Sequence, residues 1–180
     1  MRTSAVILLL ILISGASLGA QSRFEVAGGY QFMRDQDLAK SNPDLSANFP
    51  AGWMASAGVS LSGWLVAVGE VSGSMKTLDI PGDKPKLRVY TFMAGPRIQR
   101  RRRAGLNPFG EVLFGSARAT TSVLSVHETV TDFSYQPGGG VDLNTSDRFG
   151  VRLEGYYRII RAGGNNTKEP GFIAAAVFGF

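Results

Sequence analysis

The feature that most constrains the fold of this chain is an alternation of apolar and polar residues with a period of two. Near the start of the alternating region, Phe24, Val26 and Tyr30 share one face, whereas Glu25 and Gln31 lie on the other. This period is typical of β-strands that present one apolar face. The chain is therefore predicted to be all-β.

Eight segments follow this pattern, each roughly ten residues long, which is the length with which a tilted strand crosses a bilayer. They cover residues 24–32, 53–61, 64–74, 87–98, 107–118, 133–143, 148–160 and 171–180, and the register of the third to fifth is left open. Beyond the N-terminal region no apolar run approaches the roughly 18 residues of a membrane helix. Because lipid cannot satisfy an open sheet edge, a membrane protein built from such strands must be a closed barrel.

The connections between these segments alternate in length. Long polar connections at 34–50, 75–86, 119–132 and 161–170 alternate with shorter ones at 62–63, 99–105 and 144–147. Outer-membrane barrels have short periplasmic turns and longer extracellular loops. We therefore predict one domain at residues 21–180, an eight-stranded antiparallel up-and-down transmembrane β-barrel with its four long loops outside and both chain ends on the periplasmic side.

Residues 1–20 have the organisation of a secretory signal peptide. Arg2 precedes an apolar run at 5–13 and a stretch of mostly small residues at 14–20. We expect cleavage after Ala20, with Gly19 as the other option, and export toward the outer membrane of a Gram-negative bacterium. The alternative interpretation of the run is a membrane anchor or a buried helix. The chain has no cysteine, which excludes disulfides and a lipid anchor on an N-terminal cysteine.

Ionisable side chains gather on the less apolar face of the segments, at Glu25, Glu70, Arg97, Glu111, Asp142, Arg152 and Glu154. In a membrane barrel this face lines a narrow lumen, where buried charges have to pair and form hydrogen bonds. We therefore predict lumen charges at Glu70, Glu111, Asp142, Arg152 and Glu154. The alternatives are a soluble sheet on which these residues face solvent, and a soluble periplasmic lipid-binding calyx with an apolar interior.

The last predicted strand carries the most specific motif. Apolar residues alternate backward from the last residue, at Phe180, Phe178, Ala176, Ala174 and Phe172. Two further motifs are GGGVD at 138–142 and RFGVRLE at 148–154. With these motifs the chain resembles the small outer-membrane β-barrel proteins of the outer membrane protein A type. The resemblance covers nearly the whole mature chain in pattern, but only the last three strands in recognisable residues.

The resemblance implies that the barrel assembly machinery recognises Phe178 and Phe180 as an assembly signal. It also implies an eight-stranded barrel surrounded by outer-membrane lipids. Longer members of the group carry a periplasmic peptidoglycan-binding domain, which we do not expect in this chain.

Arg100, Arg101, Arg102 and Arg103 lie together in the second short connection. On the periplasmic side these four cations are expected to bind anionic phospholipid headgroups, at about 1 kcal/mol for each cation near such a surface. The alternative is a solvated turn. Because these residues account for much of the net charge of +5, and because the chain is exported, no nucleic-acid partner is expected.

Ser125, His127 and Glu128 supply the side-chain types of a hydrolase site. Adjacent residues of a strand point to opposite sides, so His127 and Glu128 would not meet, and no enzymatic activity is predicted. Phosphate loops, metal clusters and dinucleotide fingerprints are absent from the sequence, so we expect no cofactor. The predicted role is structural or interactive, with loop ligands left open and at most a very narrow pore, because side chains nearly fill an eight-stranded barrel. The alternative is a barrel enzyme that acts on membrane lipids.

Overall fold

The computed structural model of the chain describes residues 24–36, 48–77, 86–100, 105–123, 126–146, 148–162 and 165–179. The strands are β1 (Phe24–Arg34), β2 (Asn48–Phe49), β3 (Ala51–Ser60), β4 (Leu65–Thr77), β5 (Lys86–Gln99), β6 (Gly105–Val123), β7 (Val126–Asn144), β8 (Phe149–Ala162) and β9 (Asn165–Gly179). No helix in these residues is long and apolar enough to cross a membrane. The predicted signal peptide lies outside the described residues.

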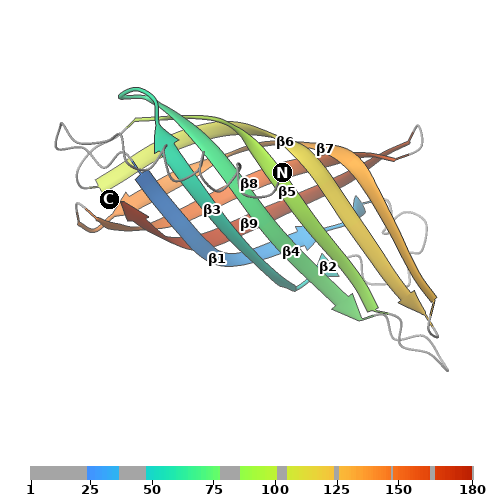
Figure 1. Cartoon of the computed structure of the whole chain (residues 1–180). Helices are drawn as coiled ribbons and strands as arrows, with labels where there is room; N and C mark the ends of the chain where they lie inside the picture. The colour runs from blue at the N-terminus through green and yellow to red at the C-terminus, as the bar shows by residue number, and fades with distance from the viewer. Residues whose placement is uncertain are drawn as a thin grey trace, which may run out of the picture.

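The strands form one antiparallel sheet that closes on itself, because β1 pairs with β9 (Figure 1). The short β2 does not count as a further strand of the wall, since it pairs only with the end of β1, through Met33–Phe49 and Arg34–Asn48. Pro50 separates β2 from β3, and a proline cannot donate a ladder hydrogen bond. The predicted all-β, eight-stranded antiparallel barrel is therefore confirmed.

The two ends of the barrel differ in how the strands are joined. β1 begins and β9 ends side by side, with Glu25 opposite Gly179, and we call this the terminal end (Figure 1). Two turns lie at this end as well, at residues 61–64 and directly after β7. They are closed by backbone hydrogen bonds such as Leu61 N to Leu65 O at 2.9 Å and Thr145 N to Phe149 O at 3.1 Å. At the opposite end, which we call the loop end, β6 leads into β7 and β8 leads into β9.

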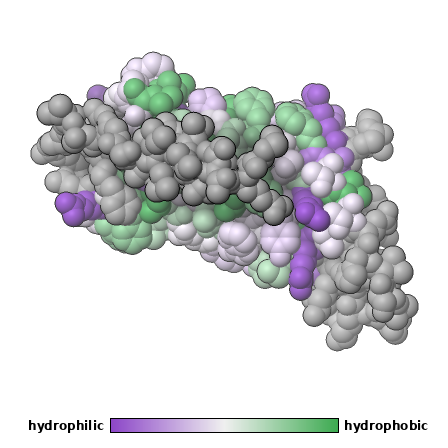
Figure 2. All heavy atoms as spheres, in the orientation of Figure 1, coloured by the Kyte–Doolittle hydropathy of each residue, from purple (hydrophilic) through white to green (hydrophobic). Residues whose placement is uncertain are grey.

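Side chains alternate along the strands between the lumen and the outer wall. In β8, Arg152 and Glu154 are buried, whereas Val151 and Leu153 are exposed. The outer wall exposes many large apolar side chains, among them Val26, Trp53, Val59, Phe92, Ile98, Val112, Phe114, Phe133, Phe149, Val151, Leu153, Phe172 and Phe178. Figure 2 shows hydrophobic residues along the visible part of this wall.

Two glycines allow neighbouring strands to approach closely. A Cβ atom on Gly140 would overlap the carbonyl oxygen of Leu153 on β8, and a Cβ atom on Gly115 would overlap that of Phe92 on β5. Glycine within a strand commonly marks a bend or a close backbone approach. The GGGVD motif therefore includes a position at which the barrel wall has no room for a larger residue.

The prediction that residues 119–132 form a long polar loop is wrong. β6 and β7 continue as a ladder through this region, with Ala119 opposite Val130 and Val123 opposite Val126. The physical reason is its content of threonine and valine, since β-branched residues favour strands. The hairpin therefore extends well past the predicted strand ends at residues 118 and 133.

The prediction of a long loop at residues 161–170 is also wrong, because β8 and β9 pair as far as Ala162–Asn165. Residues 163–164 are both glycine, and a Gly-Gly pair between two strands is a sequence signal for a hairpin. Of the other two predicted loops, residues 37–47 and 78–85 lie outside the described part of the chain.

Candidate functional site

The most structured group of polar side chains lies inside the barrel toward the terminal end. Arg97 Nη1 is 2.6 Å from Glu25 Oε1, and Arg97 Nε is 2.6 Å from Glu111 Oε2. Arg152 Nε donates to Asp142 Oδ1 at 2.7 Å, and its Nη2 donates to Asp142 Oδ2 at 2.8 Å and to Glu25 Oε1 at 3.0 Å. We call these five residues the lower ion cluster. Glu25 joins its two halves because the same oxygen accepts from both arginines.

The sheet register explains how this cluster forms. Arg97 on β5 pairs directly with Glu111 on β6, and Arg152 on β8 pairs directly with Asp142 on β7. Opposite charges at directly paired positions of one face attract each other. Glu25 reaches both arginines from β1, on the far side of the sheet order, only because the sheet is closed.

Phe109 packs between the two arginines of the lower ion cluster. Its ring centroid is 4.8 Å from the guanidinium carbon of Arg97 and 4.9 Å from that of Arg152. A guanidinium over an aromatic face is attracted by the negative face of the ring. Both arginine residues are 0% exposed. The lumen is therefore filled by side chains at this level.

A second polar group surrounds Arg158, further toward the loop end. Arg158 Nε donates to Gln136 Oε1 at 2.9 Å, and Arg158 Nη2 donates to Ser72 Oγ at 3.3 Å. Its Nη1 lies 3.8 Å from Glu169 Oε2. Gln136 in turn donates from Nε2 to Glu70 Oε1 at 3.4 Å. This group, which we call the upper ion cluster, connects β4, β7, β8 and β9.

Carboxyl groups outnumber guanidinium groups in the described part of the lumen. The buried acidic residues are Glu25, Glu70, Glu111, Asp142, Glu154 and Glu169, and the buried basic residues are Arg97, Arg152 and Arg158. Neither oxygen of the Glu154 carboxyl has a hydrogen-bond partner among the described residues. A buried charge without a partner is expensive. A proton or a small cation bound by the Glu154 carboxyl group would reduce the free-energy cost of burying it.

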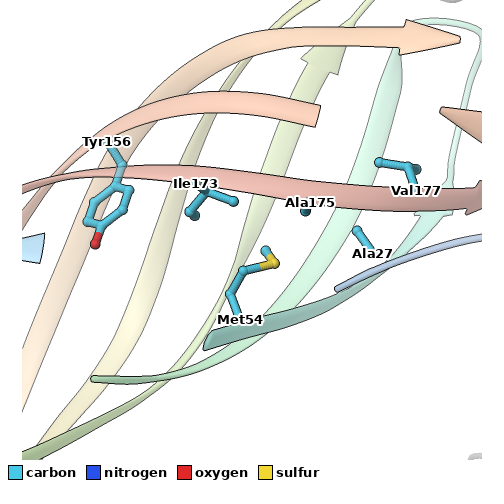
Figure 3. Close-up of a cluster of buried hydrophobic side chains, with 6 residues drawn as sticks. All are labelled: Ala27, Met54, Tyr156, Ile173, Ala175 and Val177. Atoms are coloured by element: carbon cyan, nitrogen blue, oxygen red, sulfur yellow. The ribbon is translucent and has the colours of Figure 1, made fainter. Parts of the chain in front are cut away.

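Apolar side chains fill the remaining wall of the lumen. Figure 3 shows the largest group, which projects inward from β1, β3, β8 and β9 and consists of Ala27, Met54, Tyr156, Ile173, Ala175 and Val177. A second group, formed by Val66, Val68, Met93 and Leu113, lines β4, β5 and β6. The interior therefore combines two ion clusters with packed apolar side chains.

The structure places all five residues of the predicted lumen set inside the barrel. Glu111, Asp142 and Arg152 belong to the lower ion cluster, and Glu70 belongs to the upper one. Glu154 is buried in the lumen as well. The prediction omitted Arg158, although it shares the face of Arg152 and Glu154. It also omitted Glu169, because that residue was assigned to a loop.

The other predicted site residues lie at the barrel surface or outside the described residues. Phe178 on β9 is exposed, and its ring centroid lies 5.1 Å from that of Phe149. Phe180 is outside the described residues. Arg100 is exposed and its backbone N–H donates to Pro108 O at 3.3 Å, whereas residues 101–103 are not described.

Of the hydrolase-type residues, the structure describes the backbone of His127 and Glu128, which lie at the loop end of β7. His127 pairs through its backbone with Ser122 on β6, and Glu128 pairs with Thr121. Ser125 lies outside the described residues. In the part of the chain that is described, no group of three or more acidic, histidine or cysteine side chains is arranged to hold a metal ion.

No family model matches the sequence, and a search of curated proteins finds no relative. Solved structures, in contrast, match over most of the chain. The structure is similar to Ail, the attachment invasion locus protein of Yersinia pestis, in complex with the heparin analogue sucrose octasulfate. The TM-score is 0.62 at 17% identity, covering 87% of this chain and 97% of Ail.

Two further solved structures have the same architecture. Neisserial surface protein A matches with a TM-score of 0.70 at 13% identity, covering 88% of this chain and 98% of that protein. The outer membrane protein OprG of Pseudomonas aeruginosa matches with a TM-score of 0.61 at 10% identity, covering 89% and 96%. The resemblance inferred from the sequence is thus confirmed at the level of fold: the chain has the closed eight-stranded architecture of small outer-membrane barrels.

Proposed function

We propose that this chain is an outer-membrane barrel protein of a Gram-negative bacterium, with a structural role and a surface that binds other molecules outside the cell. The observation that carries the proposal is the distribution of polarity. Charged residues such as Arg97 and Arg152 are 0% exposed inside the barrel, whereas Phe92 and Phe114 are 55% and 49% exposed on its outer wall. A polar interior with an apolar outer wall is expected of a barrel that is surrounded by lipid. A soluble lipid-binding calyx requires the opposite order.

The filled lumen supports a structural role rather than transport of large solutes. The lower ion cluster holds β1, β5, β6, β7 and β8 together through side chains that span the interior. Breaking a buried ion pair leaves an uncompensated charge, so the network favours one arrangement of the wall. At most a very narrow path for small ions is compatible with this packing.

The loop end supports a role in binding. The β6–β7 hairpin continues past the last pair between β7 and β8, Phe133–Arg161, and extends to Val123–Val126. Figure 1 shows this hairpin extending at the lower right of the molecule. Ail, a protein of similar fold, is named for attachment and binds a heparin analogue. These features favour an interaction surface at the loop end.

The proposal is tested by fractionating cells that express the full chain and by comparing heated with unheated membrane samples on gels. We expect recovery in the outer membrane and a band whose mobility shifts on boiling, because a folded barrel resists detergent until it is heated. Recovery in the soluble periplasm, without a mobility shift, would overturn the proposal.

A variant pair tests whether Phe178 belongs to an assembly signal. Phe178 and Phe172 both lie on the outer face of β9, with similar exposures of 46% and 44%. Phe178→Ala is expected to lower the amount of barrel in the outer membrane well below that of Phe172→Ala. Equal amounts would show that Phe178 acts only as one more lipid-facing side chain.

A further inference from the structure

Among the strand side chains that the structure describes, those that are charged and face outward have one sign. The outward-facing charged residues with described side chains on the strands are Arg34, Arg88, Arg118, Arg161 and Lys168, and all five are exposed. We call them the basic belt. The carboxyl groups of the described strand side chains lie on the inward face instead: six are buried in the lumen, and Asp132 shares the inward face of Ser134 and Gln136.

The basic belt lies at one end of the barrel. Arg34 ends β1, Arg88 lies near the start of β5, and Lys168 lies near the start of β9, so each is close to the loop end. Arg118 and Arg161 occupy the corresponding parts of β6 and β8. In Figure 2 several strongly hydrophilic residues of the visible face gather on the right, which is the loop end in Figure 1.

The sheet register brings two pairs of these cations together. Arg118 pairs with Tyr90, two residues from Arg88 on the same face of β5. Lys168 pairs with Ile159, two residues from Arg161 on the same face of β8. Diagonal neighbours of this kind have Cα atoms about 7–8 Å apart, within reach of long side chains. Like charges at such a spacing repel each other, and an anion between them removes that cost.

The belt borders the apolar wall. Moving from each cation toward the terminal end, the outward positions become apolar, as from Arg118 to Phe114 and from Arg88 to Phe92. Four strand residues correspond to roughly 13 Å along the strand, and to less along the membrane normal because barrel strands are tilted. A basic residue that follows exposed aromatic rings in this way matches the position at which the polar headgroups of a lipid leaflet begin.

We propose that the basic belt binds the phosphate groups of lipopolysaccharide in the outer leaflet. The inference rests on the proposed function, because the loop end has to face the outside of the cell. Guanidinium groups match phosphate geometry with two parallel hydrogen bonds, and four of the five belt residues are arginine. A phosphorylated glycolipid would supply anionic groups at headgroup depth and acyl chains against the apolar wall below.

The test uses the full mature chain, folded in detergent, with purified lipopolysaccharide as the probe. The belt variant replaces Arg88, Arg118, Arg161 and Lys168 with glutamine. A matched single-charge comparison uses Arg118→Gln in the belt and Arg148→Gln, an exposed arginine at the terminal end. We expect the fourfold belt variant to bind lipopolysaccharide at least tenfold more weakly than the natural sequence. Arg118→Gln should lose part of that factor, and Arg148→Gln should bind within twofold of the natural sequence. The natural sequence is expected to bind dephosphorylated lipopolysaccharide at least tenfold more weakly than the phosphorylated form.

Several outcomes would overturn the inference. Belt-variant binding within twofold of the natural sequence would do so. An equal loss in Arg148→Gln and Arg118→Gln would also do so, because it would indicate a nonspecific effect of net charge. Belt-dependent binding of a sulfated polysaccharide without acyl chains, in place of lipopolysaccharide, would make the belt a glycan surface. Should the fourfold variant fail to fold, the comparison of Arg118→Gln with Arg148→Gln in the same assay decides.

This experiment separates the inference from the proposed function. A natural chain that reaches the outer membrane and shifts on boiling, but binds lipopolysaccharide independently of the belt, overturns only the lipid inference. A natural chain recovered as a soluble protein without a mobility shift overturns the proposed function itself, whatever it binds.

Discussion

Arg152 contributes to the barrel through the carboxylates that it neutralises. It is 0% exposed and contacts both Asp142 and Glu25. Removal of one partner from a buried ion pair costs about 3–5 kcal/mol, because the other partner stays buried and unpaired. We therefore expect Arg152→Met to lower the free energy of unfolding in lipid by about that amount.

Urea unfolding of the barrel in lipid vesicles measures this effect. Arg148→Met, at an exposed turn residue, is the control and should change the free energy of unfolding by less than about 0.5 kcal/mol. The triple variant Arg152→Met/Asp142→Asn/Glu25→Gln should recover part of the loss. Equal stability of Arg152→Met and Arg148→Met would contradict the importance of the lower ion cluster.

Gly140 and Gly155 form a second comparison at the scale of single residues. A Cβ atom on Gly140 would overlap the Leu153 carbonyl oxygen, whereas one on Gly155 meets nothing within 4 Å. Forcing extra atoms into a packed site costs about 1–3 kcal/mol. Gly140→Ala should therefore lower the temperature at which the folded band disappears on gels, and Gly155→Ala should leave it nearly unchanged. The reverse order would show that strand spacing at Gly140 is relaxed.

At the scale of strands, the part of β7 nearest the loop end is distinctive because, among the described residues, it pairs on one side only. Val126–Asp132 pair with β6, but pairing with β8 begins only at Phe133–Arg161. Unpaired edge amides exchange faster than amides in a two-sided ladder. We expect faster hydrogen exchange at alternate amides of 126–132 than anywhere in 138–144, which pair on both sides. Uniform protection along β7 would mean that another segment covers this edge.

The strand faces were predictable from the sequence, and the strand ends were not. Period-two alternation identifies the inward face of β8 through Arg152 and Glu154, because a shift of the pairing register by one residue would place these charges on the outer wall. Loop assignment failed where polar residues are also strand formers, as at Thr120 and Thr129, whose hydroxyl oxygens lie 3.3 Å apart across the hairpin.

The partners of the lumen charges were less predictable than their position. Cross-strand partners such as Arg97 and Glu111 follow once two neighbouring strands are in register, but that register was open for the third to fifth segments. Contacts across the lumen, such as Glu25 with Arg152, depend on how the whole sheet closes. Glu169 was not predicted as a lumen charge because the first residues of β9, which include Glu169, were assigned to the loop at 161–170.

At the scale of the whole molecule, the filled lumen predicts how little the barrel conducts. Phe109 lies between two fully buried arginines, so vesicles containing the protein should not swell in isotonic sugar solutions. Phe109→Ala removes the ring from this level and is expected to increase leakage of small ions in a planar bilayer. Rapid sugar entry through the natural chain would contradict a closed lumen.

The orientation of the whole barrel toward lipid can be tested by adding one charge at two depths. On β6 the outward residues run from Leu106, beside the terminal-end turn, through Val112 to Arg118 in the basic belt. Val112 thus lies midway, where an arginine on the lipid face costs about 2–4 kcal/mol, whereas near an interface it costs about 0–1 kcal/mol. Val112→Arg should therefore destabilise the barrel in vesicles far more than Leu106→Arg, as measured by urea unfolding. A soluble sheet would tolerate both substitutions equally, because both side chains would face water. Similar unfolding free energies for the two variants would therefore contradict the conclusion that the outer wall of the barrel faces lipid.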